Sequence, residues 1–224
     1  MKGVEKRYAP FVAEIEALAG NRRRGADALF DAVRMMALSI ESAVSLDARA
    51  PESEFKALRE RHADAEYGHV TAAFAELVLA LDADRTEFLG HVRERCFEAT
   101  NTRNGQFLTP TNISSMMGDV LAGPPREDGG IVRLNDPSCG CGVLVIQVAE
   151  AFLAKGWRQA DILIDAGDLD GRALDMCYVQ LSLLGYAAVV RHQNALTRQY
   201  SGPTPVRYTP GWYLHGFPMR GISA

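Results

Sequence analysis

The sequence predicts an α/β fold in which a partial parallel sheet follows a helical N-terminal domain, and three patterns lead to this prediction. Apolar residues in the first hundred positions recur at the three- and four-residue spacing of amphipathic helices. From residue 131 onward, short apolar runs alternate with amphipathic stretches, which is typical of a parallel sheet with right-handed crossovers. A glycine-rich turn, residues 135–142, follows the first apolar run. Together they indicate half of a doubly wound nucleotide-binding fold.

The helical domain is expected to span residues 1–103, and the α/β domain residues 104–224. Helical spacing runs from Leu29 to Val44 and again from Tyr67 to Leu81. Asp84 and Glu87 resemble a capping box, which predicts a third helix through Cys96.

The α/β domain is expected to open with a helix that has Thr109 as its N-cap and Pro110 at its first position. This helix carries one apolar face, made of Ile113, Met116, Met117, Val120 and Leu121. Strands are then expected at residues 131–134, 161–166 and 187–191, with helices at residues 143–154 and 173–184.

The glycine-rich turn is expected to bring its backbone close to a ligand, since glycine leaves the main chain unobstructed and the N–H groups exposed. The dinucleotide pattern G-x-G-x-x-G does not fit, because Val145 stands where the third glycine should be. A different nucleoside ligand is therefore expected.

Three segments in order, residues 105–110, 135–142 and 167–170, resemble the adenine-specific DNA methyltransferases of type I restriction-modification systems. The resemblance covers residues 102–196. It implies a Rossmann-like class I methyltransferase sheet, here partial, and S-adenosylmethionine as cofactor. In that family the first segment lies over the methionine part of the cofactor, and the glycine-rich turn wraps the same end.

The resemblance also implies residue roles. Asp136 would face the amino group of the cofactor, and Asp168 the ribose hydroxyls. Asp170 competes with Asp168 for the ribose, or else caps the following helix. Asn194 would accept a hydrogen bond from the adenine through its carbonyl oxygen. The cofactor-binding residues expected are Gln106, Phe107, Thr109, Pro110, Asp136, Pro137, Ser138, Gly140, Gly142, Asp168, Leu169, Asn194 and Ala195.

Other reactive side chains receive structural interpretations. His192 follows the third strand, where a loop histidine is expected to be solvated or structural rather than catalytic. Cys139 and Cys141 lack a second Cys or His pair at zinc spacing, so no metal site is expected.

The family's catalytic turn, Asn or Asp followed by two prolines and an aromatic residue, has no counterpart in the sequence. No catalytic residue can therefore be assigned, and we expect the isolated chain not to methylate DNA. Two readings follow: a DNA methyltransferase whose base-binding turn comes from a partner, and a non-catalytic cofactor-binding module with a regulatory or scaffold role.

Composition limits the partners. The net charge is −4, and Arg22–Arg24 is the only cationic cluster, so weak DNA binding by the chain alone is expected. No apolar run reaches membrane-spanning length and no signal segment opens the sequence, which predicts a cytoplasmic protein without membrane contact.

The family's strand order places the first strand between the second and the fourth, so loss of the fourth would leave an open sheet edge. Residues 206–208 and 212–214 have strand-like composition. We expect this aromatic tail to pack back along the sheet, or a protein partner or second subunit to cover the edge.

Overall fold

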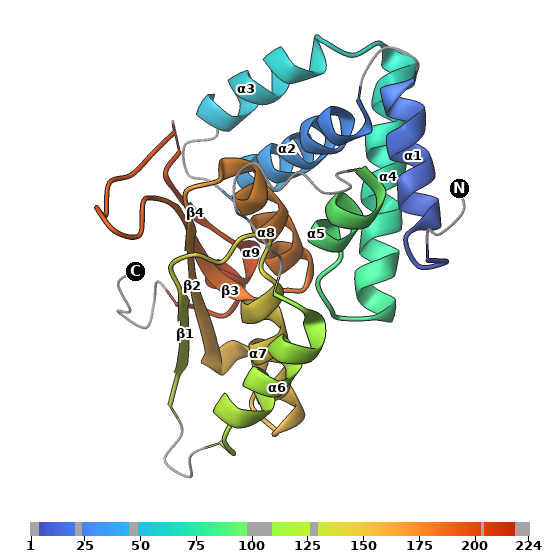
Figure 1. The fold of residues 1–224 in the computed structure, drawn as a ribbon. Helices are drawn as coiled ribbons and strands as arrows, with labels where there is room; N and C mark the ends of the chain where they lie inside the picture. The colour runs from blue at the N-terminus through green and yellow to red at the C-terminus, as the bar shows by residue number, and fades with distance from the viewer. Residues whose placement is uncertain are drawn as a thin grey trace. The chain divides into compact units, whose positions relative to one another are not determined.

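The computed structural model describes residues 5–20, 24–44, 49–97, 109–125, 130–202 and 204–217. The chain divides into two compact units, residues 1–84 with 88–107 and residues 85–87 with 108–224 (Figure 1). The predicted boundary at residues 103/104 lies outside the described residues. None of the described helices combines the length and hydropathy needed to cross a membrane.

The first unit is helical, and the two predicted helices are confirmed as α2 and α4. Its core is aromatic as well as aliphatic: the ring of Phe88 meets those of Tyr8 and Phe11 edge-to-face, with centroids 5.0 and 5.4 Å apart. The helical elements are α1 (Ala9–Ala19), α2 (Gly25–Val44), α3 (Arg49–Arg59), α4 (Asp64–Ala83), α5 (Leu89–Val92) and the π-helix η1 (Arg93–Phe97).

The predicted capping box at Asp84 and Glu87 is wrong. Asp84 closes α4 instead of opening a helix, because its N–H donates to the carbonyl of Ala80. The side chain of Glu87 is buried within the second unit. The next helix begins only at Leu89.

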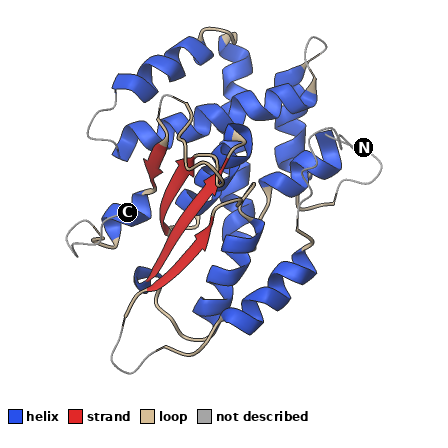
Figure 2. Cartoon of the chain, turned by 60° about the vertical axis from the view of Figure 1, so that its left-hand side comes forward, coloured by secondary structure: helices blue, strands red, loops and turns tan. Residues whose placement is uncertain are grey.

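The second unit holds a single four-stranded sheet within its described residues, in the order β1-β2-β3-β4 (Figure 2). The first three strands are parallel, and β4 runs antiparallel to β3. The predicted α/β class, with its alternating strands and helices, is confirmed. The elements are α6 (Thr111–Leu121), β1 (Val132–Asp136), α7 (Val143–Ala154), the 3-10 helix η3 (Gln159–Asp161), β2 (Ile162–Asp168), α8 (Gly171–Leu183), β3 (Ala187–His192), β4 (Val206–Tyr208) and α9 (Pro210–Leu214).

The two faces of the sheet are covered differently. Both crossovers, β1-α7-β2 and β2-α8-β3, step in the same direction, so α7 and α8 lie on the same face. Alternate strand residues point to the opposite face. There Leu163, Ala187 and Val189 form a buried cluster with Trp212 and Phe217 from the C-terminal segment.

The aromatic tail packs back along the sheet, as predicted, but at the β3 edge. Residues 206–208 form β4, whereas residues 212–214 belong to α9 and not to a strand. Pro210 occupies the first position of this helix, where a missing N–H is harmless. Within the described residues β1 pairs only with β2 and remains at an edge.

Polar contacts fix the tail to the body of the unit. The Thr209 hydroxyl accepts a hydrogen bond from the Ala188 N–H (2.8 Å) and donates to the Tyr186 carbonyl (2.6 Å). Arg207 of β4 forms a buried ion pair with Asp175 of α8, 2.6 Å long. The tail is therefore an integral part of the fold.

Gly211→Ala should destabilise the protein, because a Cβ at Gly211 would run into the main-chain carbonyl of Tyr186. We expect the free energy of unfolding, measured by urea denaturation, to fall by about 1–3 kcal/mol. A Cβ at Gly123 meets nothing within 4 Å. Gly123→Ala is the control and should change stability by no more than about 1 kcal/mol. Equal losses in the two variants would contradict the tail packing.

Candidate functional site

The loops that follow β1, β2 and β3 meet at one edge of the sheet. The strands are parallel and in register, with Asp136 opposite Ala166 and Asp168 opposite His192. In open α/β sheets, ligands bind beside such carboxyl ends. This edge is therefore the candidate site.

The turn between β1 and α7 has two glycines with positive φ, +55° at Gly140 and +98° at Gly142. A Cβ at Gly140 would meet no atom within 4 Å, so the backbone there is open to a ligand. Gly142 differs from the sequence expectation: a Cβ there would lie 3.0 Å from the Cys177 sulfur. Its glycine is needed for packing against α8 and leaves no space beside the turn.

Asp168 joins the three loops. One carboxylate oxygen accepts the Gly140 N–H and the other accepts the Asp170 N–H, each at 2.8 Å. Its main-chain carbonyl accepts the Gln193 N–H at 3.1 Å, and the neighbouring Gly167 carbonyl accepts the Cys139 N–H at 2.9 Å. Residues 167–168 thus hold the loops after β1 and β3 in place.

Asp136 supplies a second carboxylate at this edge. It accepts a hydrogen bond from the Ser138 N–H at 3.0 Å. Burial raises the pKa of Asp136, the Ser138 hydrogen bond lowers it, and the negative charge of Asp168 raises it further. The net shift is upward, so a positive charge placed here would be favoured.

Asp170 caps α8 by accepting the Arg172 N–H at 3.0 Å, which confirms the second of its two predicted roles. The structural interpretation of His192 is also supported, since its Nε2 lies 3.0 Å from the Leu169 carbonyl oxygen. The side chain of Leu169 points to solvent and is exposed.

Asn194 builds its own loop. Its Oδ1 accepts the N–H groups of Leu196 (2.9 Å) and Thr197 (3.1 Å). An amide oxygen has two lone pairs, and both are used here. The amide nitrogen is thus the side-chain group better suited to a ligand, a donor in place of the expected acceptor. Ala195, next in the loop, is exposed.

The upstream segment is only partly described. Gln106 and Phe107 lie outside the described residues. Pro110, not Thr109, is the N-cap of α6, because its carbonyl accepts the first helical hydrogen bonds from Ile113 and Ser114. The structure therefore brings the following predicted residues together at this edge: Asp136, Pro137, Ser138, Gly140, Asp168, Leu169 and Asn194. Among the hydrogen bonds of the described residues, none joins Thr109 or Pro110 to this group.

Comparison with known families agrees with this geometry. The family model described as N-6 DNA methylase matches residues 86–206, just over half of the chain. The chain belongs to the N-6 DNA methylase family. No curated protein and no solved structure matched the chain.

The sequence did not predict one residue that supports the site. It is Gln180, which contacts Glu87 near the start of the region that matches the family. Gln180 of α8 is fully buried, and its amide donates to the Cys141 carbonyl behind the turn and to the Glu87 carboxylate, both at 3.1 Å. The signal was a glutamine within the apolar stretch 173–184. This contact attaches the segment 85–87 to the glycine-rich turn.

The thiols behind the turn are structural. Cys139, Cys141 and Cys177 are buried. A hydrogen bond with Cys177 and burial raise the pKa of the Cys139 thiol well above its usual range, so it stays protonated at neutral pH. Within the described part of the chain, no cluster of His, Cys, Asp and Glu is arranged to hold a metal ion.

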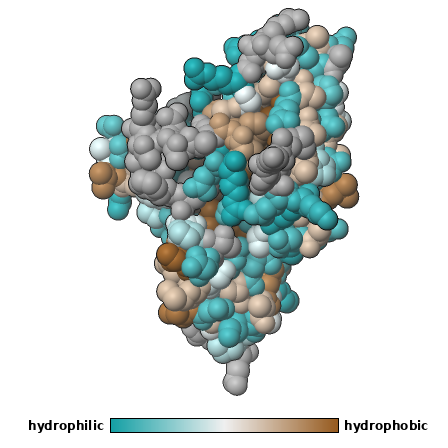
Figure 3. All heavy atoms as spheres, turned by 45° about the vertical axis from the view of Figure 1, so that its right-hand side comes forward, coloured by the Kyte–Doolittle hydropathy of each residue, from teal (hydrophilic) through white to brown (hydrophobic). Residues whose placement is uncertain are grey.

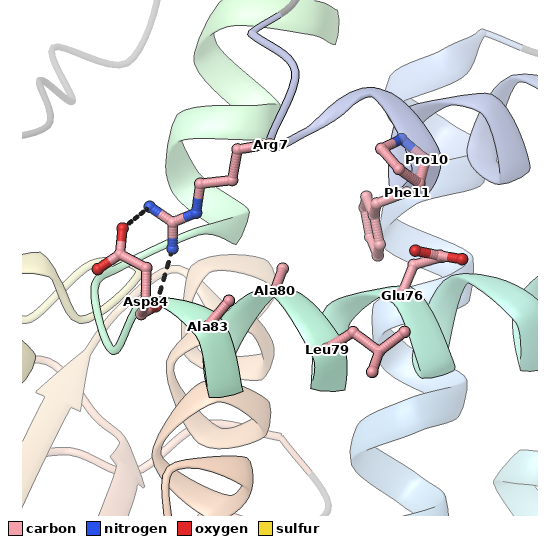
Figure 4. Close-up of a pocket in the computed structure, with 8 residues that line it drawn as sticks. All are labelled: Arg7, Pro10, Phe11, Glu76, Leu79, Ala80, Ala83 and Asp84. Atoms are coloured by element: carbon pink, nitrogen blue, oxygen red, sulfur yellow. Dashed lines mark hydrogen bonds and ion pairs between the residues drawn. The ribbon is translucent and has the colours of Figure 1, made fainter.

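A groove of about 360 Å³ in the helical unit, between α1 and α4, is a weaker candidate (Figure 4). Its charged end is closed by an ion pair between Arg7 and Asp84, 2.7 Å long. Phe11, Leu79 and alanines line much of the remainder. This groove offers no grouping of acid, base or nucleophile.

Asp136→Asn should stabilise the free protein at neutral pH. The folded pKa of Asp136 is raised, so its ionised form opposes folding once the pH exceeds that pKa. The gain in melting temperature over wild type should be present at pH 7 and vanish near pH 3, where the carboxyl is protonated in both states. Asp119→Asn, at an exposed position of α6, is the control for charge alone. A lower melting temperature for Asp136→Asn at pH 7 would contradict the acidic character of the site.

Proposed function

We propose that the α/β domain, residues 104–224, is a Rossmann-like class I methyltransferase domain that binds S-adenosylmethionine, and that the chain is an adenine-specific DNA methyltransferase-like protein. The observation that carries this proposal is Asp168, whose carboxylate lies where the loops after the three parallel strands meet. Family membership supports the same cofactor.

The residues present fit the cofactor. The open backbone at Gly140 would accommodate the methionine portion, with Pro137 and Ser138 beside it, and Asp136 would pair with its amino group. Each Asp168 oxygen already accepts one N–H and keeps a second lone pair for a ribose hydroxyl. Leu169 and Ala195 offer exposed apolar surface for the adenine, with Asn194 at its polar edge. Gln106, Phe107, Thr109 and Pro110 would cover the methionine end.

S-adenosylmethionine would supply an activated methyl group, but the sequence contains no Asn-Pro-Pro-aromatic or Asp-Pro-Pro-aromatic turn like the one that receives the target adenine in the family. Of the aromatic residues after Leu196, Tyr200 and Tyr213 are exposed, whereas the others described are used in packing. Trp212 and Phe217 are buried against the sheet, and the ring of Tyr208 lies 5.0 Å from that of Trp212. We therefore propose that the isolated chain does not methylate DNA.

The alternative function, a non-catalytic cofactor-binding module for regulation or scaffolding, is favoured by the surface of the sheet. In parallel sheets both faces are usually apolar, because helices cover them. Here Arg133 and Asn135 of β1 are exposed on the face opposite α7, beside a 2.8 Å ion pair between Asp165 and Arg191. This polar part of the sheet face is better suited to contact with water than to packing against helices of a partner that would complete a methyltransferase fold.

DNA remains the proposed substrate, but the chain alone is proposed to bind it only weakly. A net charge of −4 gives little electrostatic attraction to phosphates, so the chain alone would bind DNA weakly and would rely on a partner for affinity.

Isothermal titration calorimetry should detect binding of S-adenosylmethionine or its demethylated product. Asp168→Ala should weaken binding by about 1–3 kcal/mol, since charged hydrogen bonds to the ribose are lost. Asp170→Ala is the matched control: it loses a helix cap, about 1 kcal/mol of stability, and should keep its affinity. Circular dichroism checks that both variants fold. Equal losses of affinity would show that the assignment of the ribose to Asp168 and not to Asp170 is wrong. No heat from the folded wild type at millimolar ligand would refute cofactor binding.

Transfer of labelled methyl groups to adenine-containing duplex DNA should stay at background for the chain alone, because nothing orients the target amine and orientation supplies several kcal/mol of catalysis. A complete adenine DNA methyltransferase serves as the positive control. Robust transfer that Asp168→Ala abolishes would overturn this prediction.

A further inference from the structure

The helix α6 presents its apolar face to solvent. Ile113, Met116, Met117, Val120 and Leu121 recur at helical spacing, and their exposed fractions run from 36% at Met117 to 78% at Val120. Figure 3 shows that exposed hydrophobic side chains form separate brown spots among hydrophilic ones on the surface. We name these five residues the α6 stripe.

The opposite side of α6 is what attaches it to the domain. Gly118 lies against α7, where a Cβ would approach Ala151 Cβ to 3.0 Å and the Gln147 carbonyl oxygen to 3.1 Å. Ser114 is fully buried, and the Ser115 hydroxyl bonds the Gln147 side chain at 3.3 Å. Small residues therefore stand at the contact with α7, and turning the α6 stripe inward would replace them with bulky ones.

The α6 stripe is large for a monomer. Taken together, its five side chains expose as much surface as two to three fully exposed large residues would. This amounts to roughly 500 Å², near the upper end of the 300–600 Å² of the largest apolar patch on a typical monomer. The largest apolar patch of a monomer is often a functional site.

We propose that the α6 stripe is a homodimer interface in which two copies of α6 pack antiparallel about a two-fold axis beside Met116 and Met117. The axis places Ile113 of one copy against Leu121 of the other, at both ends of the pair, as an isologous interface requires. Methionine side chains adapt their shape, which suits the crowded position at the axis. The stripe itself contains no charged residue that would oppose its own copy.

A second copy fits better than a membrane surface. Helices that lie on membranes carry Lys or Arg on their polar face. The only charged residue of α6 is Asp119, which anionic lipids would repel. Two stripes together would bury about 1,000 Å², the lower limit for a specific interface, so the dimer should be weak and concentration-dependent.

Sedimentation velocity across a concentration series tests the proposal on the full chain. Wild type should shift from monomer to dimer between about 1 and 300 μM, and Met116→Glu should remain monomeric throughout. Leu79→Glu is the matched control, because Leu79 on α4 is 62% exposed against 61% for Met116. It should dimerise like wild type. A wild-type chain that stays monomeric throughout, or a dimer that Met116→Glu leaves intact, overturns the proposal.

Cysteine cross-linking tests the antiparallel arrangement, in a Cys96→Ser background because the other native cysteines are buried. Under mild oxidation Met117→Cys, beside the axis, should form a disulfide-linked dimer. Ile113→Cys and Leu121→Cys should cross-link when mixed and not when each is alone. Efficient cross-linking of Ile113→Cys to itself would show a parallel pair and overturn the proposed arrangement.

Discussion

The carboxyl edge of the sheet depends on the hydrogen bonds of Asp168. Its two oxygens accept the Gly140 and Asp170 N–H groups, and its carbonyl accepts that of Gln193. Hydrogen bonds to a charged acceptor contribute about 1.5–3 kcal/mol each, more than neutral ones. The side chain that a ligand would contact is thus the one that holds the loops in position. Much of the ordering that binding requires is already present in the free protein.

A second layer of contacts supports this edge from behind. Gln180 connects the glycine-rich turn to Glu87 within the buried part of the domain, and Gly142 allows α8 to approach the turn closely. On the far face, α9 covers the amino-terminal half of β2 and β3, while Asn135, Asp165 and Arg191 keep the carboxyl-terminal half polar. A parallel sheet is normally covered on both faces, whereas on this face a short aromatic tail covers part of the sheet and exposed polar side chains occupy the rest.

Local sequence patterns predicted the positions of the strands and helices well, but they predicted the packing contacts of these elements less well. Alternating apolar runs located β1, β2 and β3 to within two residues at each end, and Asp170 was recognisable as a cap. Periodicity could not tell which side of α6 packs, since Gly118 permits a close helix contact that apolar residues do not. Composition also misplaced residues 212–214, where Pro210 starts a helix. The role of Gln180 depends on contacts with residues 39 and 93 positions away in the chain, which no local pattern encodes. The contacts of Asn194 are local, since asparagine commonly binds backbone N–H groups two and three residues on, and this use of its oxygen was overlooked.

The chemistry of the edge discriminates between nucleotide ligands. A glycine-rich turn at a helix N-terminus commonly binds phosphate through free N–H groups. Here Asp168 occupies the Gly140 N–H, and Asp136 adds a second carboxylate whose pKa is raised partly by the first. A phosphate would meet two negative charges, whereas a ligand with a positive charge and hydroxyl donors would satisfy both carboxylates. Repulsion between two neighbouring carboxylates lowers the folding stability of the ligand-free protein. Such clusters of like charge are typical of functional sites. The two carboxylates therefore support the proposal of a cationic nucleoside, and not a dinucleotide, as the ligand of this edge.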